Sequence, residues 1–376
     1  MRLISFVGTG PYQEVAYALR PDGHRVRTRF ITEALAQLLR PDQVSLLLTE
    51  RAADHENRHA LQARLLELGF SVEPVSIPDG RSQVELWELF RQVGALAPAG
   101  ETLALDITHA FRSLPAVALL SAGYFQALGR IHLQGLYYGA FEAKDQEGRA
   151  PIFDLTAMLA LPAWALAARS WQEQANASAL RELTRAAHAQ AWGEGAARPR
   201  WLGGLANALE AFGDNLALAR HDLADQAAQL DRCLRQGAEE VASHAPPLAP
   251  LLAQAAAPLL PLQQSGLAGE LALVRWQLES GHILAAALLA REWLVSYWMH
   301  AQALADRDSA ELALGALAQL FDGSQPGALW DELGKLRNDL AHCGHNLAPT
   351  AARRIPARLA QYVVQLEGLH HKLAKP

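Results

Sequence analysis

The chain has 376 residues, of which 51% are hydrophobic and 19% charged, and its net charge is −6 at pH 7. A chain of this length is too long to fold around one typical hydrophobic core, so we expect two or three domains. Because the net charge is negative, a nucleic acid would have to bind a local basic surface. Two cysteines exclude a disulfide framework, the apolar runs are too short to span a bilayer, and MRLISFVGTG lacks the features of a secretory signal, which together predict a cytoplasmic protein with no membrane partner.

The first 160 residues alternate short β-like runs with helical stretches, a pattern typical of an α/β domain with a mainly parallel sheet. Strands are predicted over 2–8, 44–49, 71–77 and 102–108, and helices over 55–69, 82–96 and 111–129. The runs 131–141 and 151–156 are predicted to be strands that close the domain as a hairpin. Residues 24–30 fit either an early strand or the start of the helix TRFITEALAQLL.

The strand pattern stops after residue 156, and the rest of the chain has helical spacing. Residues 161–264 are predicted to form an all-α connector. Its final part, 245–264, carries five prolines and therefore forms a hinge or a series of short helices. Residues 265–376 are predicted to form an all-α C-terminal domain, with helices over 269–280, 283–304 and 326–342 and a last one from about residue 351.

Gly8, Thr9 and Gly10 follow the first predicted strand directly. Two glycines allow backbone N–H groups to approach a ligand closely, and a following helix would add its positive N-terminus. The full dinucleotide fingerprint GxGxxG is absent, because Val15 and Ala16 stand where later glycines would help. Taken alone, the motif is better explained as a tight turn than as a ligand loop.

A second polar segment, Asp106 to Ser113, stands where another strand ends and a helix begins. Thr108 and His109 offer hydrogen-bonding groups, and Arg112 offers a guanidinium fork suited to phosphate. Ligands bind at the carboxyl ends of strands in open α/β sheets, so we expect this segment and the glycine loop to meet at one rim. The alternative is a helix N-cap at Thr108, with His109 and Arg112 as solvated surface residues.

The segments GTGPYQEVAY, Asp-x-Thr-His with its following Phe-Arg, and PIFDLT resemble the CRISPR-associated DxTHG-motif family, the CARF–HEPN proteins of type III CRISPR systems. The resemblance covers about residues 1–160 and 265–376. It implies a Rossmann-like CARF domain that dimerises and binds cyclic oligoadenylate across the two-fold axis. The expected ligand residues are Gly8, Thr9, Gly10, Tyr12, Thr108, His109 and Arg112.

The resemblance leaves the size of the activator ring open, with cyclic tetra-adenylate favoured over hexa-adenylate. Thr108 and His109 make slow cleavage of the ring conceivable. One departure from the family is visible, because the glycine that follows the histidine is Ala110 here. Alanine fits a helix start but would be strained in a left-handed backbone, which bears on the ligand geometry.

The stretch KLRNDLAHCGHN, residues 335–346, ends a leucine-rich helix. An apolar stripe runs along it at i, i+4, i+7 and i+11, formed by Leu329, Leu333, Leu336 and Leu340. At about 100° per residue, Asn338 and His342 share the opposite face, whereas Arg337 lies on the flank, about 140° from His342. A second copy of the helix would bring arginine and histidine together, which favours a dimer. Gly344 is predicted to take the left-handed cap after His342.

These side chains are suited to RNA cleavage without a metal. A histidine titrates near neutral pH and can act as general base or acid for a 2′-hydroxyl that attacks its own phosphate, and an arginine can stabilise charge on the phosphoryl oxygens. Asn338 would orient His342 or hold substrate. Chance alone gives about one Arg-x4-His match in such a composition, and a surface helix end explains the residues equally well.

Arg337-Asn338-x-x-Ala341-His342 resembles the HEPN ribonuclease motif, whose two copies form one composite site in a dimer. The resemblance therefore implies an allosteric endoribonuclease. Cyclic oligoadenylate would bind a homodimer or higher even oligomer and switch on cleavage of single-stranded RNA, leaving 2′,3′-cyclic phosphate ends. The catalytic residues would be Arg337, Asn338 and His342.

Two other interpretations stay open. A nucleotide-sensing interaction module would keep the HEPN domain as an inactive dimerisation domain, although intact Arg337 and His342 argue against degeneration. A Rossmann dehydrogenase is a further possibility, but the sequence lacks the third glycine and a convincing ribose-binding acid that such an enzyme needs. No metal or cofactor is expected, because His342, Cys343 and His345 offer too few ligands in a suitable pattern. Glu292 is expected either to pair with an arginine such as Arg337 or to lie solvated beside Arg291.

Overall fold

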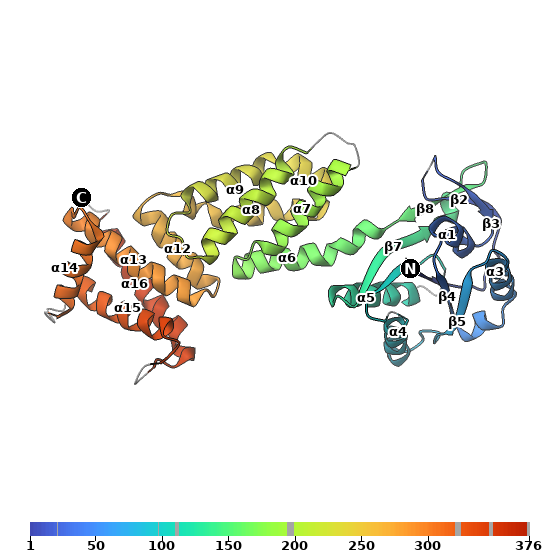
Figure 1. The fold of residues 1–376 in the computed structure, drawn as a ribbon, viewed down its shortest axis with the longest axis horizontal. Coiled ribbons are helices and arrows are strands. Elements are labelled where there is room, and N and C mark those ends of the chain that lie inside the picture. Colours follow the sequence, from blue (N-terminus) through green and yellow to red (C-terminus); the bar gives the residue numbers. More distant parts are fainter. Residues whose placement is uncertain are drawn as a thin grey trace. The chain divides into compact units, whose positions relative to one another are not determined.

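Eight strands of the N-terminal region form one sheet in the order β3-β2-β8-β7-β6-β1-β4-β5. The computed structural model describes residues 1–20, 22–96, 98–109, 113–193, 199–319, 325–345 and 349–373. The strands are β1 Arg2–Phe6, β2 Val15–Ala18, β3 Val26–Thr28, β4 Gln43–Leu48, β5 Ser71–Ser76, β6 Glu101–Asp106, β7 Ile131–Gly139 and β8 Arg149–Asp154 (Figure 1). The chain divides into two units, Met1–Leu161 and Pro162–Pro376.

Five of these strands, β5, β4, β1, β6 and β7, are parallel to one another. The predicted mainly parallel α/β sheet is therefore confirmed. β8 runs antiparallel to β7, which confirms the expected hairpin. Each helix that follows a parallel strand crosses over one face of the sheet, which is the arrangement of an open, doubly wound α/β fold.

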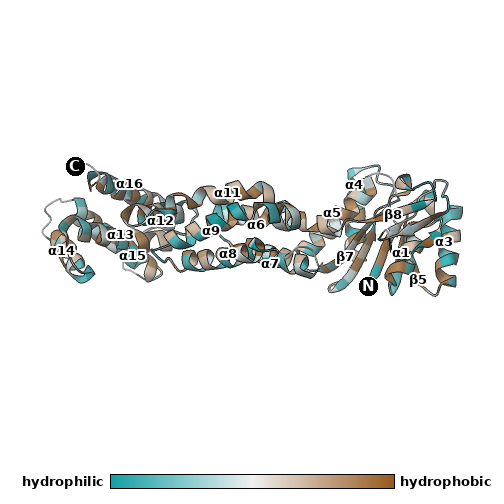
Figure 2. Cartoon of the chain, turned by 90° about the horizontal axis from the view of Figure 1, so that it is seen from above, coloured by the Kyte–Doolittle hydropathy of each residue, from teal (hydrophilic) through white to brown (hydrophobic). Residues whose placement is uncertain are grey.

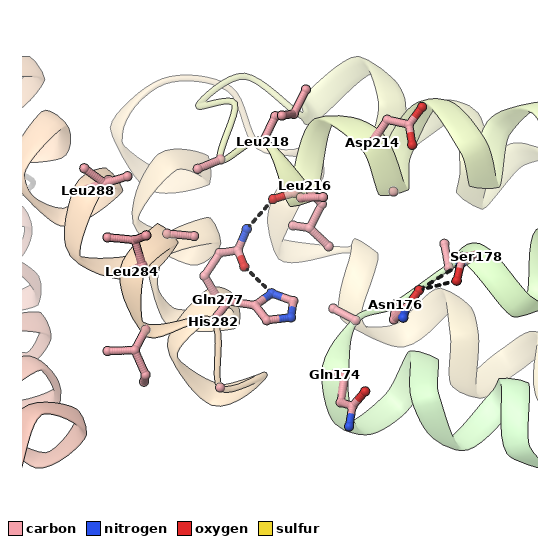
Figure 3. A pocket seen from close by; sticks show the side chains of 18 of the residues that line it. Gln174, Asn176, Ser178, Asp214, Leu216, Leu218, Gln277, His282, Leu284 and Leu288 are labelled. Atoms are coloured by element: carbon pink, nitrogen blue, oxygen red, sulfur yellow. Dashed lines mark hydrogen bonds between the residues drawn. The ribbon is translucent and has the colours of Figure 1, made fainter. Parts of the chain in front are cut away.

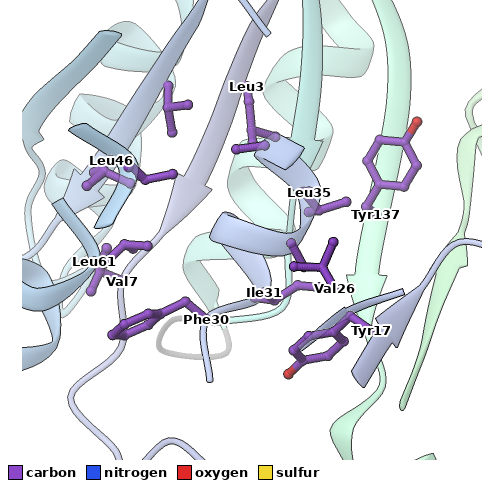
Figure 4. Packing of buried hydrophobic residues seen from close by; sticks show 14 of the residues in the cluster. Leu3, Val7, Tyr17, Val26, Phe30, Ile31, Leu35, Leu46, Leu61 and Tyr137 are labelled. Atoms are coloured by element: carbon purple, nitrogen blue, oxygen red, sulfur yellow. The ribbon is translucent and has the colours of Figure 1, made fainter. Parts of the chain in front are cut away.

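Helices cover both faces of this sheet. They are α1 Ile31–Leu39, the short α2 Glu50–Ala53, α3 Glu56–Glu67, α4 Gln83–Ala95 and α5 Ser113–Ala127. Because successive side chains of a strand point to opposite faces, Leu3 packs with α1 and α3, whereas Ile4 packs with α4 and α5. Figure 4 shows the first of these two cores, where Ile31 and Leu35 of α1 lie among the strands. Brown, apolar residues are concentrated in the strands in Figure 2.

A short antiparallel hairpin, β2–β3, separates β1 from the first helix. This corrects the expectation that a helix follows the glycine loop and adds its N-terminus there. The run Val15–Ala18 is fully buried and pairs with β8, beginning at Ala16 opposite Arg149. An extended conformation therefore gives its buried backbone N–H and C=O groups hydrogen-bond partners. Residues 26–28 are a strand, and α1 begins only at Ile31.

The second unit is built from helices, which confirms the predicted all-α character of this region. The helices are α6 Leu161–Gln174, α7 Ser178–Gly193, α8 Trp201–Ala217, α9 Ala224–Gln236, α10 Ala238–His244, α11 Leu252–Ala256, α12 Leu267–Glu279, α13 Ile283–Gln302, α14 Arg307–Gln319, α15 Gln325–Ala341 and α16 Ile355–Leu373. The proline-rich stretch is a series of short helices: 3₁₀ turns Pro246–Leu251, Ala257–Leu259 and Pro261–Gln263 flank α11. Sequence analysis missed α14. Among the described helices, none is long and apolar enough to cross a bilayer.

Candidate functional site

The glycine loop and the Thr108–His109 segment leave neighbouring strands at the switch point of the sheet. β1 pairs with β6, and the strand order runs outward from this pair, to β4 and β5 on one side and to β7 on the other. Loops at such a point diverge to opposite faces and leave a crevice at the carboxyl edge. A side chain built on Gly8 would have its Cβ 3.6 Å from the Cβ of His109, so the two loops meet as predicted.

Tyr12 closes the glycine loop onto itself. Its hydroxyl accepts a hydrogen bond from the Gly8 N–H at 2.7 Å and donates one to the Gly8 carbonyl at 3.2 Å. Asn57 of α3 donates to the carbonyls of Gly8 and Gly10, at 3.1 and 2.9 Å. The Gly8 N–H is therefore already bonded within the chain, which corrects the expectation that it faces a ligand. Thr9 and Gly10 are exposed and carry the open part of the loop.

The Tyr12 ring stacks on the imidazole of His109, with centroids 4.5 Å apart and planes at 21°. The pKa of the Tyr12 hydroxyl is raised well above its usual range, mainly because the group is buried. Burial likewise lowers the pKa of His109 from its ordinary 6.5, although Asp106 and Glu142 oppose this shift. Among the described residues, Nε2 of His109 is buried and has no hydrogen-bond partner. His109 as a whole is half-buried, and an imidazole nitrogen without a partner can hydrogen-bond a polar ligand that reaches it.

Asp106 is the fully buried carboxylate that holds this edge together. One oxygen accepts from Ser5 Oγ of β1 at 2.6 Å, and the other accepts from the N–H and hydroxyl of Thr108, at 3.0 and 2.5 Å. The Thr108 hydroxyl oxygen also accepts from the Gly139 N–H of β7 at 2.8 Å. Thr108 thus joins β6 to β7 and positions the loop, rather than standing free for a ligand. Sequence analysis quoted Asp106 but assigned it no role.

One residue of the predicted ligand set, Arg112, and the residue that departs from the family, Ala110, belong to a short segment before α5. Ala110 and Arg112 lie outside the described residues, so the expectations placed on them stay predictions. The helix α5 begins at Ser113.

In the second unit, α15 presents the face that its leucine spacing predicts. Leu329, Leu333 and Leu336 are buried, and Leu340 is half-buried. Asn338 and His342 are exposed on the other side, and Arg337 is half-buried on the flank. The Arg337 guanidinium donates to Asn338 Oδ1 at 2.8 Å. The exposed imidazole of His342 and the Arg337–Asn338 pair are therefore both accessible to a large substrate such as a polynucleotide.

The end of α15 differs from the expected glycine cap. Gly344 N–H bonds to the carbonyl of Asp339 at 2.9 Å and Cys343 N–H to that of Leu340 at 3.1 Å, a Schellman arrangement. The left-handed residue that follows the helix is Cys343, with φ 53°, and Gly344 at φ 75° comes next. A non-glycine residue in this conformation costs roughly 1 kcal/mol. Asp339 is buried and accepts from the Thr350 N–H at 2.8 Å, which ties the chain after the cap to the helix.

A second arginine lies near the first. Arg291 of α13 places its guanidinium over the Trp330 ring of α15, 3.9 Å from the centroid. Burial lowers the pKa of Arg291, Glu311 opposes this, and the nearby charge of Arg337 lowers the pKa further. Glu292 pairs with Arg307 and lies 3.6 Å from Arg291, so its partner is not Arg337. Arg291 is therefore a largely buried cation near Arg337, held by Trp330 and by Glu292 and Glu311, and sequence analysis did not find this arrangement.

A cleft of about 1010 Å³ lies between the end of α8 and the α12–α13 turn. Gln277 crosses it, donating to the Leu216 carbonyl at 2.7 Å while its oxygen meets His282 Nδ1 at 2.6 Å (Figure 3). Leu340 of α15 lines the same cleft. The cleft therefore reaches the helix that carries Arg337 and ends just before His342.

No protein-family model matches the chain. The chain is similar to the CRISPR-associated protein MJ1674 of Methanocaldococcus jannaschii, with 31% identity over 88 residues. The match covers 23% of this chain and 14% of that relative. It supports a CRISPR association at this coarse level and leaves the activity to be proposed.

Proposed function

We propose that this chain is an endoribonuclease of CRISPR defence, activated by cyclic oligoadenylate and acting on single-stranded RNA without a metal. The observation that carries the proposal is α15: one face is buried in the unit, while Arg337, Asn338 and His342 are accessible at its carboxyl end. A helix that served packing alone would not need this set of residues. The partial similarity to a CRISPR-associated protein supports the biological setting.

The proposed reaction uses the RNA itself as nucleophile. The 2′-oxygen attacks the adjacent phosphorus, the bond from phosphorus to the 5′-oxygen breaks, and the products are a 2′,3′-cyclic phosphate and a 5′-hydroxyl. His342 takes the proton of the 2′-hydroxyl, and the His342 of a second copy returns a proton to the leaving oxygen. Arg337 stabilises the charge on the phosphoryl oxygens, and the Arg337–Asn338 hydrogen bond fixes the guanidinium for that task.

The activator is proposed to bind at the switch point of the first unit. Thr9 and Gly10 supply the open loop, and the unpartnered Nε2 of His109 supplies a hydrogen-bonding group beside it. Tyr12 holds the His109 ring by stacking, so its role is to position that imidazole. The proposed activator is cyclic tetra-adenylate or hexa-adenylate, with the smaller ring favoured.

A cleavage assay tests the proposal. Fluorescent single-stranded RNA is incubated with the full chain, with and without each cyclic oligoadenylate. The wild type and a His371→Ala control, which removes an exposed histidine of α16, should cleave when activator is present. His342→Ala should lose at least about 100-fold in rate, the usual contribution of a general acid or base.

The same assay carries two outcomes that contradict the proposal. Activator binding without any cleavage would favour the inactive sensing module. Loss of cleavage on adding EDTA would refute the metal-independent reaction, because Arg337 and His342 are proposed to act alone.

A further inference from the structure

The guanidinium of Arg337 has no carboxylate partner among the residues that the structure describes. It donates instead to the uncharged amide of Asn338, at 2.8 Å. Lys335, the other cation near this end of α15, pairs with Asp331 at 2.6 Å and lies 3.8 Å from Glu332. Carboxylate and phosphate oxygens accept from the same guanidinium fork, so a carboxylate partner on Arg337 would compete with a phosphate.

A second guanidinium, that of Arg291, lies on this side of the unit. The helices α13, α14 and α15 pack against one another, and Arg291 of α13 contacts both of the others (Figure 1). It lies 3.9 Å from the ring centroid of Trp330 on α15 and 3.8 Å from an oxygen of Glu311 on α14. Only 16% of the Arg291 side chain is exposed, so these contacts hold it in place.

Glu311 is the carboxylate whose pairing depends on Arg291. Glu292 also lies near Arg291, at 3.6 Å, but it forms an ion pair with Arg307 as well. Within the described part of the chain, Arg291 is the cation that pairs with Glu311. The Glu311 side chain is 42% exposed and can therefore reorient. Loss of Arg291 would release Glu311 beside α15.

Arg337 lies on the face of α15 that Arg291 contacts. Trp330, Gly334 and Arg337 follow one another at i, i+4 and i+7, which places them along one side of the helix. A Cβ added at Gly334 would have no neighbouring atom within 4 Å, so the stretch of this face between Trp330 and Arg337 is open. The long side chain of Arg337 can therefore move along the helix toward a released Glu311.

We infer that Arg291 is a positioning residue, which holds Glu311 and so keeps it from pairing with Arg337. Arg337 then stays bonded to the neutral Asn338, and its charge remains available to the phosphoryl oxygens of a substrate. The inference deepens the proposed function and rests on it, because Arg337 is proposed there to stabilise the charge on those oxygens.

Arginine-specific modification tests the inference in the full chain without RNA or activator. Phenylglyoxal labels accessible guanidiniums, and mass spectrometry follows the peptide that carries Arg337. Arg291→Gln should slow the labelling of Arg337 at least about threefold, the size of effect expected of a partly exposed ion pair. Arg291→Gln combined with Glu311→Gln should restore the rate of the wild type, because the competing carboxylate is gone.

Two further variants serve as controls in the labelling experiment. Arg291→Lys keeps a cation beside Glu311 and should label Arg337 within about twofold of the wild type. Arg275→Gln breaks an ion pair with Glu367 in the same unit and should leave the labelling of Arg337 unchanged. Melting temperatures confirm that each variant is folded.

The cleavage assay separates positioning from packing with the same variants. Arg291→Gln should lower kcat for RNA at least about threefold, and Glu311→Gln in that background should recover it. A role of Arg291 in packing alone predicts no recovery, because the contact with Trp330 is still missing.

The inference is overturned if Arg291→Gln leaves the labelling of Arg337 unchanged, or if Glu311→Gln does not restore it. A wild type that cleaves no RNA would count against the proposed function, whereas the labelling would still show whether Arg291 keeps Arg337 unpaired.

Discussion

At the scale of single residues, the carboxyl edge of the sheet is organised by the buried Asp106 and the half-buried His109, which have different tasks. Asp106 is surrounded by the hydroxyls of Ser5 and Thr108, so its charge is hydrogen-bonded inside the fold. His109 is held by stacking on Tyr12, and its Nε2 has no partner among the described residues. The first group therefore fixes the loops, and the second is the one equipped to meet a ligand.

The lowered pKa of His109 predicts how stability depends on pH. Burial favours the neutral imidazole, so the unfolded chain binds a proton more readily below pH 6.5. The contribution of His109 is fully present above pH 6.5 and is lost as the pH falls through the lowered pKa. The urea midpoint of the wild type should therefore fall more between pH 7.5 and pH 5.5 than that of His109→Gln. Exposed His345→Gln should behave like the wild type, and equal pH dependence in all three would contradict the assignment.

At the scale of elements, α4 and α5 pack closely because one of them lacks a side chain at the contact. A Cβ added at Gly94 of α4 would lie 2.5 Å from Cζ of Phe125, closer than real contacts allow. A Cβ added at Gly315 of α14 would have no neighbouring atom within 4 Å. The two glycines thus share a helical setting and differ in the space around them.

Alanine substitutions at these glycines should have effects of opposite sign. Gly94→Ala should destabilise the chain by about 1–3 kcal/mol, because Phe125 must move within a packed core. Gly315→Ala should stabilise it by about 0.5–1 kcal/mol, because alanine loses less backbone entropy in a helix. Chemical denaturation measures both changes. A neutral Gly94→Ala would show that α4 and α5 pack less tightly than described.

At the scale of the whole molecule, the proposed sensor and the proposed nuclease lie in different units, Met1–Leu161 and Pro162–Pro376. Their functions should therefore be separable by mutation. His109→Ala should raise the activator concentration for half-maximal RNA cleavage about tenfold, which corresponds to about 1.4 kcal/mol for a lost contact. His342→Ala should bind labelled activator as the wild type does and cleave RNA at least about 100-fold more slowly. An unchanged activation midpoint in His109→Ala would remove that residue from the activator site.

The sequence by itself determined the features that depend on local periodicity. Alternating runs predicted the parallel strands to within two residues, as at 71–77 against Ser71–Ser76. Leucine spacing predicted which face of α15 is buried and left Asn338 and His342 exposed. These features follow from the repeat of the element itself, which any window of the chain contains.

Only the tertiary structure decided the features that join distant parts of the chain. Pairing with β8 made Val15–Ala18 a strand that sequence analysis did not predict, and the Tyr12 hydroxyl took the Gly8 N–H that was expected to face a ligand. The same holds for α5: its sequence predicts a helix, but which of its apolar faces is left uncovered depends on where the sheet and α4 lie. Hydrogen-bond partners and exposed faces are set by long-range packing, and no local pattern encodes them.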